Sequence, residues 1–136
     1  MGTEITVDAM GILYTSMQIE HPGRRGSVSA PLRALVDSGA ELSWAPAAVL
    51  ESLGVSREKR TTFTRADGGT MTRDVGYALV HAAGGVTIDE VVFGEDKDLV
   101  LLGARSIEGL NVKIDLIGKR FVSAGPMPVG GNVIVA

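Results

Sequence analysis

The stretch that decides the fold is Leu35–Ala40, with the sequence Leu-Val-Asp-Ser-Gly-Ala. In the segment that leads into it, apolar residues occupy every second position, at Val28, Ala30, Leu32, Ala34 and Val36. Such alternation is typical of a half-buried β-strand, because successive side chains point to opposite faces of a sheet. The sequence therefore predicts a strand that delivers Asp37 into a polar turn.

A second apolar stretch, Leu99–Gly103, has the same form but carries no carboxylate. A short helical pattern follows each stretch, at Pro46–Gly54 after the first and at Ala104–Leu110 after the second. Proline in the first turn and glycine at the end are typical helix boundaries. Because the second stretch is apolar without interruption, we expect that strand to be covered on both faces.

Alternating or continuously apolar segments predict about eight or nine short strands in all. These segments lie at residues 5–20, 28–36, 59–66, 71–81, 86–93, 99–103, 112–116, 120–122 and 133–135. Asp67-Gly68-Gly69 lies between the segments at 59–66 and 71–81 and predicts a hairpin turn that joins them. With 18 glycines among 136 residues, the chain has the turn-forming residues that an all-β fold requires.

The length fits one domain, since domains usually have about 100–200 residues. We assign residues 1–124 to this domain and residues 125–136 to a C-terminal tail. Pro126 and Pro128 mark the tail as a linker that leads to the last apolar segment.

Composition excludes several kinds of chemistry. The chain has no cysteine and two histidines, His21 and His81, which excludes disulfides, thiol nucleophiles and a three-histidine zinc site, and disfavours a Ser-His-Asp triad. We therefore expect no metal and no cofactor. The formal net charge of −3 and the lack of a long basic run argue against nucleic-acid binding.

No targeting or membrane segment is readable. Glu4 and Asp8 interrupt the N-terminal region where a signal peptide would need a continuous apolar stretch. The apolar runs are also far shorter than the ~20 residues that span a bilayer. We expect no membrane partner and a cytoplasmic location.

Three motifs occur in a defined order: Leu35–Ala40, the hairpin Ala66–Gly69, and Leu101–Gly103 with its following helix. Together they resemble the retropepsin-like aspartic proteases, the single-domain relatives of retroviral protease, and especially stand-alone bacterial-type members. The resemblance covers roughly Tyr14–Val122. It implies an all-β, small closed β-barrel-like fold with one or two short helices, in a homodimer.

The resemblance implies an aspartic endopeptidase with Asp37, Ser38 and Gly39 as its catalytic residues. Two adjacent carboxylates share one proton, so one can activate water as a base while the other donates to the substrate carbonyl. The chain supplies one such carboxylate, and a two-fold homodimer would bring Asp37 beside its symmetry mate. Ser38 would hold the turn, and Gly39 would allow close approach of the backbone.

The family pattern also implies a peptide- or protein-binding surface. The expected substrate-binding residues are Ala40, Trp44, Asp67, Gly68, Gly69, Leu101 and Leu102. The hairpin would act as a flap over an extended peptide, and Trp44 would narrow or obstruct the cleft. Residues 125–136 would add a strand to the dimer interface, and an ion pair between Glu41 and Arg105 would support the dimer.

Two other functions stay open at this stage. One is a dimeric binding module of the same fold without useful proteolysis, because of Trp44 or a restricted flap. The other is a nucleotide-binding fragment, since an Asp-x-Gly turn also occurs in phosphate-binding sites of actin-like folds. The second is disfavoured because the chain lacks the Gly-x-x-x-x-Gly-Lys-[Ser/Thr] pattern.

Overall fold

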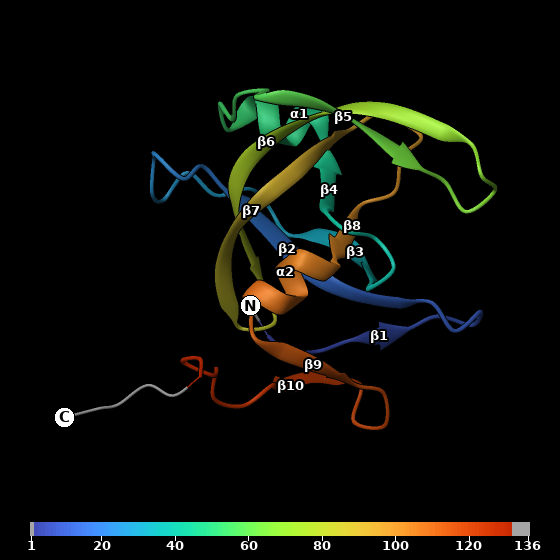
Figure 1. Ribbon diagram of the computed structural model, residues 1–136, viewed down its shortest axis with the longest axis vertical. Coiled ribbons are helices and arrows are strands. Elements are labelled where there is room, and N and C mark those ends of the chain that lie inside the picture. Colours follow the sequence, from blue (N-terminus) through green and yellow to red (C-terminus); the bar gives the residue numbers. More distant parts are fainter. Residues whose placement is uncertain (1, 132–136) are drawn as a thin grey trace.

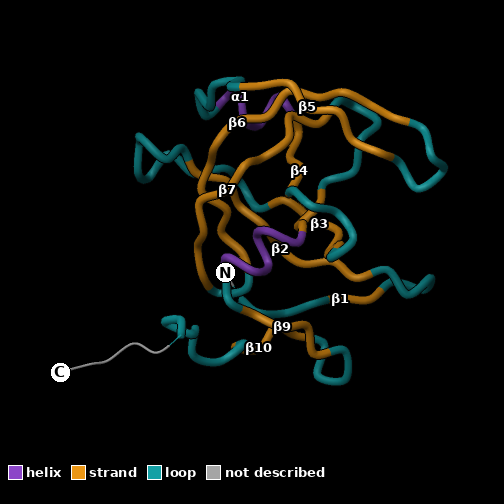
Figure 2. The backbone as a smooth tube through the Cα atoms, viewed as in Figure 1, coloured by secondary structure: helices purple, strands orange, loops and turns teal. Residues whose placement is uncertain are grey.

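The computed structural model describes residues 2–131, which form ten strands and two short helices. The strands are β1 (Thr6–Val7), β2 (Leu13–Glu20), β3 (Leu32–Asp37), β4 (Ser43–Pro46), β5 (Lys59–Thr64), β6 (Thr70–Ala82), β7 (Gly85–Gly94), β8 (Leu101–Gly103), β9 (Val112–Asp115) and β10 (Arg120–Ser123). The helices are α1 (Ala47–Ser52) and α2 (Ala104–Gly109). Figure 2 shows how strands dominate the backbone. The prediction of an all-β fold with two short helices is confirmed.

Eight strands form one sheet in the order β1-β2-β3-β8-β4-β7-β6-β5, and β2 also pairs with β6. That extra pairing makes a circuit of six strands, β2-β3-β8-β4-β7-β6, which wraps around the main core (Figure 1). The small β9–β10 sheet lies beside the N-terminal segment, where Glu4 bridges to Arg120. Neither helix in residues 2–131 has the length and apolar character needed to cross a bilayer.

Two parallel pairings place the Asp-Ser-Gly turn. β3 runs parallel to β8 with Asp37 opposite Gly103, so the two strands end at the same level of the sheet. β4 runs parallel to β7 and touches β8 at the pair Trp44 and Leu101. The turn after β3 therefore lies next to the start of α2.

Buried residues form two apolar clusters. The main core fills the inside of the strand circuit and includes Met17, Ile19, Leu50, Phe93 and Leu102, each at most 1% exposed. The second group, which we call the Trp44 cluster, consists of Leu42, Trp44, Val75 and Val92, with Phe63, Met71 and Leu101 packed against it. It joins the β5–β6 hairpin to the rest of the sheet.

The expectation that Leu99–Gly103 is a strand covered on both faces is wrong for its first residues. Pairing with β3 and β4 begins at Leu101, and the Leu99 side chain is 64% exposed. The preceding turn is fixed at Asp98, whose carboxylate accepts hydrogen bonds from the backbone N–H of Glu95 and from Arg73 of β6, so the chain joins β3 and β4 only after Leu99. β4 is a strand that the sequence did not predict, and the apolar segment at 133–135 lies outside the described residues.

Candidate active site

The turn after β3 fixes the Asp37 side chain. Its Oδ1 accepts a hydrogen bond of 2.9 Å from the Gly39 backbone N–H, and its carbonyl oxygen accepts one of 3.2 Å from Ala40 N–H. A Cβ atom at position 39 would lie 3.1 Å from that Oδ1, so glycine leaves room for the carboxylate. Asp37 is half-buried at the end of its strand, with the turn folded around it.

Helix α2 anchors this turn through the backbone. Ala104 N–H donates to the carbonyl oxygen of Ala40 at 2.7 Å, and Arg105 N–H donates to that of Glu41 at 3.1 Å. These two N–H groups open a helix and have no partner within it. The helix therefore holds the Asp37 turn by two of its free donors.

A buried pair of hydroxyls reinforces the same junction. The Ser43 hydroxyl accepts a hydrogen bond of 3.0 Å from Gly103 N–H and shares one of 2.7 Å with the Ser106 hydroxyl. Both serines are completely buried. Since buried polar groups require partners, these residues connect β4, β8 and α2 as one unit.

A hollow of about 850 Å³ opens in front of Asp37, and we call it the Asp37 hollow. Its lining residues are Asp37, Gly39, Ala40, Glu41, Leu42, Trp44, Thr62, Phe63, Thr64, Arg65, Ala66, Met71, Lys97, Asp98, Leu99 and Leu101. The Trp44 and Phe63 rings meet there with their centroids 5.1 Å apart and their planes inclined at 56°. The site thus combines one carboxylate turn with an apolar, partly aromatic surface.

The β5–β6 hairpin forms one side of the Asp37 hollow. Its tip is held by the Asp67 carboxylate, which accepts a hydrogen bond of 2.8 Å from Gly69 N–H. This hydrogen bond, followed by the charge of Arg65, lowers the pKa of Asp67. Gly68 has a positive φ of 87°, which suits glycine. The tip therefore has a defined turn structure, and Figure 1 shows the end of the hairpin projecting beyond the other strands of the sheet.

Two of the three carboxylates in the Asp37 hollow are engaged by arginines. Arg105 Nε donates to Glu41 at 3.0 Å, so the predicted ion pair between these residues exists within one chain. Asp98 accepts two hydrogen bonds from Arg73, of 2.6 and 3.0 Å, which lower its pKa. Asp37 forms no ion pair with any residue in the described part of the chain. It is the carboxylate that remains available for chemistry.

The structure brings together some of the predicted site residues and separates others. Asp37, Gly39, Ala40, Trp44 and Leu101 all line the Asp37 hollow. The other predicted residues lie elsewhere. Ser38 is exposed and borders a separate shallow hollow beside α2, whereas the hairpin tip, outside the lining of the Asp37 hollow, contains Asp67, Gly68 and Gly69. Leu102 is fully buried in the main core. The Leu102 side chain therefore packs the interior.

Sequence reasoning missed the residues that two other segments contribute. The arm of the hairpin supplies Thr62, Phe63 and Thr64, and the loop after β7 supplies Lys97, Asp98 and Leu99. The available signal was the alternation that predicts the hairpin, since alternate side chains of one arm must face the same side of the sheet. The loop carried no comparable signal, because a short polar segment is typical of any surface turn.

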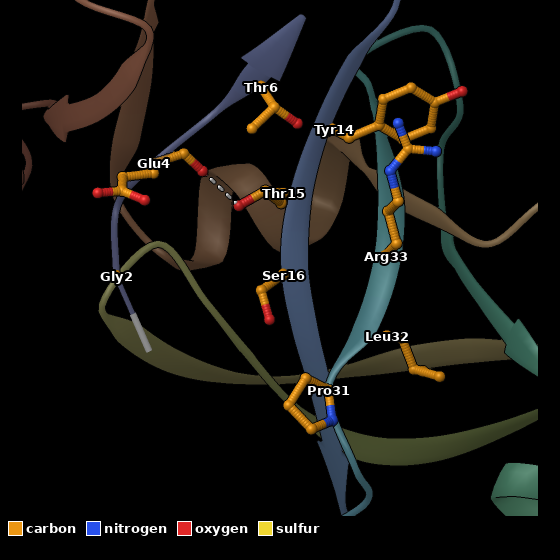
Figure 3. A pocket seen from close by; sticks show the side chains of 9 residues that line it. All are labelled: Gly2, Glu4, Thr6, Tyr14, Thr15, Ser16, Pro31, Leu32 and Arg33. Atoms are coloured by element: carbon orange, nitrogen blue, oxygen red, sulfur yellow. Dashed lines mark hydrogen bonds between the residues drawn. The ribbon is translucent and has the colours of Figure 1, made fainter. Parts of the chain in front are cut away.

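A second hollow, of about 410 Å³, lies where the N-terminal segment crosses β2 and β3 (Figure 3). Here the Arg33 guanidinium lies 3.5 Å from the centroid of the Tyr14 ring, and the Thr15 hydroxyl donates to the carbonyl oxygen of Glu4 at 2.9 Å. Glu4 is the single carboxylate among the lining residues, and Figure 3 shows it pointing away from Tyr14 and Arg33. This hollow therefore brings no pair of catalytic groups together.

Both histidines have structural hydrogen bonds. His21 Nδ1 accepts a hydrogen bond from Gly23 N–H, and His81 Nε2 lies 2.7 Å from Oε1 of the buried Glu20. The Gly26 N–H, followed by His81, lowers the pKa of Glu20 to about 2. Across residues 2–131, no three His, Cys, Asp or Glu side chains gather in a way that could hold a metal ion.

No protein-family model matches the chain, and no curated protein matches it. Among solved structures, the chain is similar to the solution structure of simian foamy virus (mac) protease, with 23% sequence identity and a TM-score of 0.49. The match covers 70% of this chain and 91% of the viral chain.

Proposed function

We propose that the chain is an aspartic endopeptidase that hydrolyses peptide bonds in extended polypeptides and acts as a homodimer. The observation that carries this proposal is Asp37 itself, a half-buried carboxylate without an ion pair in the described chain, at the mouth of an apolar hollow beneath a hairpin. The turn that holds it is fixed by backbone hydrogen bonds from Gly39 and from α2. A carboxylate positioned in this way is suited to proton transfer.

The second carboxylate must come from a second copy. Hydrolysis by paired carboxylates requires two that share one proton, and the other two carboxylates of the hollow, Glu41 and Asp98, are each hydrogen-bonded to an arginine. A two-fold axis beside Asp37 would place the two copies of this residue in contact. The proton then belongs to the pair, as do its apparent pKa values.

In the proposed reaction the ionised Asp37 of one subunit takes a proton from water, while the protonated Asp37 of the other subunit donates its proton to the carbonyl oxygen of the substrate. Water oxygen bonds to the carbonyl carbon and gives a tetrahedral intermediate. The Asp37 carboxyl that received the proton of water then protonates the amide nitrogen, while the other Asp37 carboxylate takes a proton from a hydroxyl of the intermediate. The carbon–nitrogen bond breaks to leave an acid and an amine, and the pair again holds one proton. The backbone N–H of Gly39 holds the Asp37 carboxyl group in position through its hydrogen bond of 2.9 Å to Oδ1.

The β5–β6 hairpin would close over the peptide. β5 lies at the edge of the sheet, and Thr62, Phe63 and Thr64 near its end line the Asp37 hollow. Closure would exclude water from the carboxylates and strengthen their electrostatic interactions with the substrate. The hairpin tip at Asp67–Gly69 is proposed to be the leading edge of this flap.

A second candidate function is a dimeric peptide-binding module that cleaves little or nothing. Trp44 favours it, because its ring occupies the floor of the Asp37 hollow and packs against Phe63 of the hairpin. An aromatic floor of this kind could bind apolar side chains in a register that holds the peptide bond away from Asp37.

The two functions differ in a direct assay. Wild-type protein and the Asp37→Asn variant are incubated with a peptide library from acidic to neutral pH, and Asp96→Asn serves as a control because Asp96 is exposed and does not line the Asp37 hollow. If the chain is a protease, the wild type and the Asp96→Asn control should cleave peptides, and Asp37→Asn should cleave none. Peptide binding without cleavage supports the binding module. A strict monomer by sedimentation at the concentrations where cleavage occurs would overturn the paired-carboxylate mechanism.

A further inference from the structure

The floor of the Asp37 hollow is formed by Trp44, whose side chain is tightly packed. Trp44 is 8% exposed and packs in its cluster against Val75 and Val92, which are completely buried. Its backbone is paired on both sides, with Leu101 of β8 and with Val92 of β7. A rotation of the indole ring would therefore have to displace side chains that are themselves closely packed.

Phe63 fixes the other side of this floor. Its ring lies 5.1 Å from that of Trp44, in a tilted arrangement that aromatic pairs prefer. Phe63 belongs to β5, whereas Trp44 belongs to β4 and follows the Asp37 turn after a few residues. The depth of the hollow at this point is thus set by one residue from the catalytic side and one from the hairpin.

We infer that Trp44 is the specificity-determining residue of the Asp37 hollow, and that it restricts the substrate side chain seated there to a small apolar one, such as alanine or valine. This inference rests on the proposed function and names its substrate class. A small side chain would lie against the indole face and bury apolar area, whereas leucine or phenylalanine would need space that the rings of Trp44 and Phe63 occupy.

The test uses peptides in which each position around the scissile bond is varied among Ala, Val, Leu and Phe. Wild type is expected to prefer Ala or Val at one position, and Trp44→Val is expected to raise the ratio of kcat/KM for Phe over Ala at that position by about tenfold or more. This ratio does not depend on the fraction of folded protein, because both peptides compete for the same enzyme molecules. Phe93→Leu is the control, since Phe93 is buried in the main core outside the hollow and should leave the ratio unchanged.

A binding measurement separates this inference from the proposed function. Trp44 is the single tryptophan of the chain, so its fluorescence reports directly on peptides that enter the hollow of the Asp37→Asn variant. Calorimetry with the same peptides then compares Asp37→Asn with the double variant that also carries Trp44→Val. If small-residue peptides bind better and Trp44→Val reverses this preference, the inference holds even where the wild type cleaves nothing.

Three results would overturn the inference. The first is an unchanged size preference in Trp44→Val, in cleavage or in binding. The second is a wild type that prefers Phe at every position. The third is the absence of any peptide binding, because a specificity pocket must take up a side chain. Loss of cleavage alone would refute the protease and leave the inference standing.

Discussion

Replacement of Ser43 by alanine should destabilise the protein through its effect on two buried groups. The Ser43 hydroxyl accepts from Gly103 N–H at 3.0 Å and is bonded to the Ser106 hydroxyl at 2.7 Å, and neither serine is exposed. Removing it leaves a backbone N–H and a hydroxyl without partners in the interior. The change touches no residue that we propose to contact the substrate.

The size of the effect follows from what the two groups lose. A buried donor left without an acceptor costs about 1–3 kcal/mol, and a lost hydrogen bond between hydroxyls about 1 kcal/mol. Ser43→Ala should therefore lower the free energy of unfolding by about 2–4 kcal/mol. Ser56→Ala is a suitable control and should change it by less than about 0.5 kcal/mol, because Ser56 is exposed.

Urea denaturation at one fixed protein concentration measures these differences, since the stability of the proposed homodimer would depend on concentration. The double variant Ser43→Ala and Ser106→Ala removes both hydroxyls, so no buried hydroxyl is left without a hydrogen-bond partner. Its destabilisation should be smaller than the sum of the two single changes by about 1 kcal/mol. Additive effects, or a loss below about 1 kcal/mol for Ser43→Ala, would refute the view that this pair fastens α2 to the Asp37 turn.

Two further predictions concern pH and close packing. The pKa of Glu20 is about 2 in the folded protein against an ordinary 4.5, so its contribution to stability is complete above about pH 4.5 and disappears as the pH falls toward 2. Glu20→Gln should therefore make the urea midpoint depend less steeply on pH between these values. An equally steep dependence in the variant would contradict the assignment. Gly103→Ala should cost about 1–3 kcal/mol, measured in the same urea assay, because a Cβ there would lie 2.5 Å from the carbonyl carbon of Leu42. Gly85→Ala, where the nearest atom is 3.5 Å away, is its control, and equal effects of the two would show that close packing at Gly103 is not the cause.

Much of the fold was predictable because the strands follow the two-residue period of side-chain direction. The alternation from Val28 to Val36 led to β3, and the Asp-Gly-Gly turn led to the β5–β6 hairpin. The Asp37 turn could be placed at a strand end for the same reason. These features depend on local sequence, which a single chain reveals directly.

The loop at residues 95–100 was predictable only as a polar turn. Its place beside Asp37 depends on Arg73 of β6, whose two hydrogen bonds to Asp98 fasten the loop to a strand far away in the sequence. The same pairing explains why Leu99 is exposed, although its sequence neighbours predict a buried strand. Contacts over such distances leave no periodic signal, because either partner alone is typical of a surface charge.

The strand β4 escaped prediction for a different reason, and that reason bears on the site. All of its first three residues, Ser43–Ala45, are buried, so polarity does not alternate along it, and Pro46 suggested a helix start instead. Successive side chains of a strand nevertheless point to opposite faces of the sheet. Here Ser43 is hydrogen-bonded to Ser106 of α2, while Trp44 faces the Asp37 hollow. The two roles are therefore separable: a substitution at Trp44 changes the floor of the hollow while the hydrogen bond between Ser43 and Ser106 still holds the turn. The proposed peptide specificity could thus vary without loss of the Asp37 geometry.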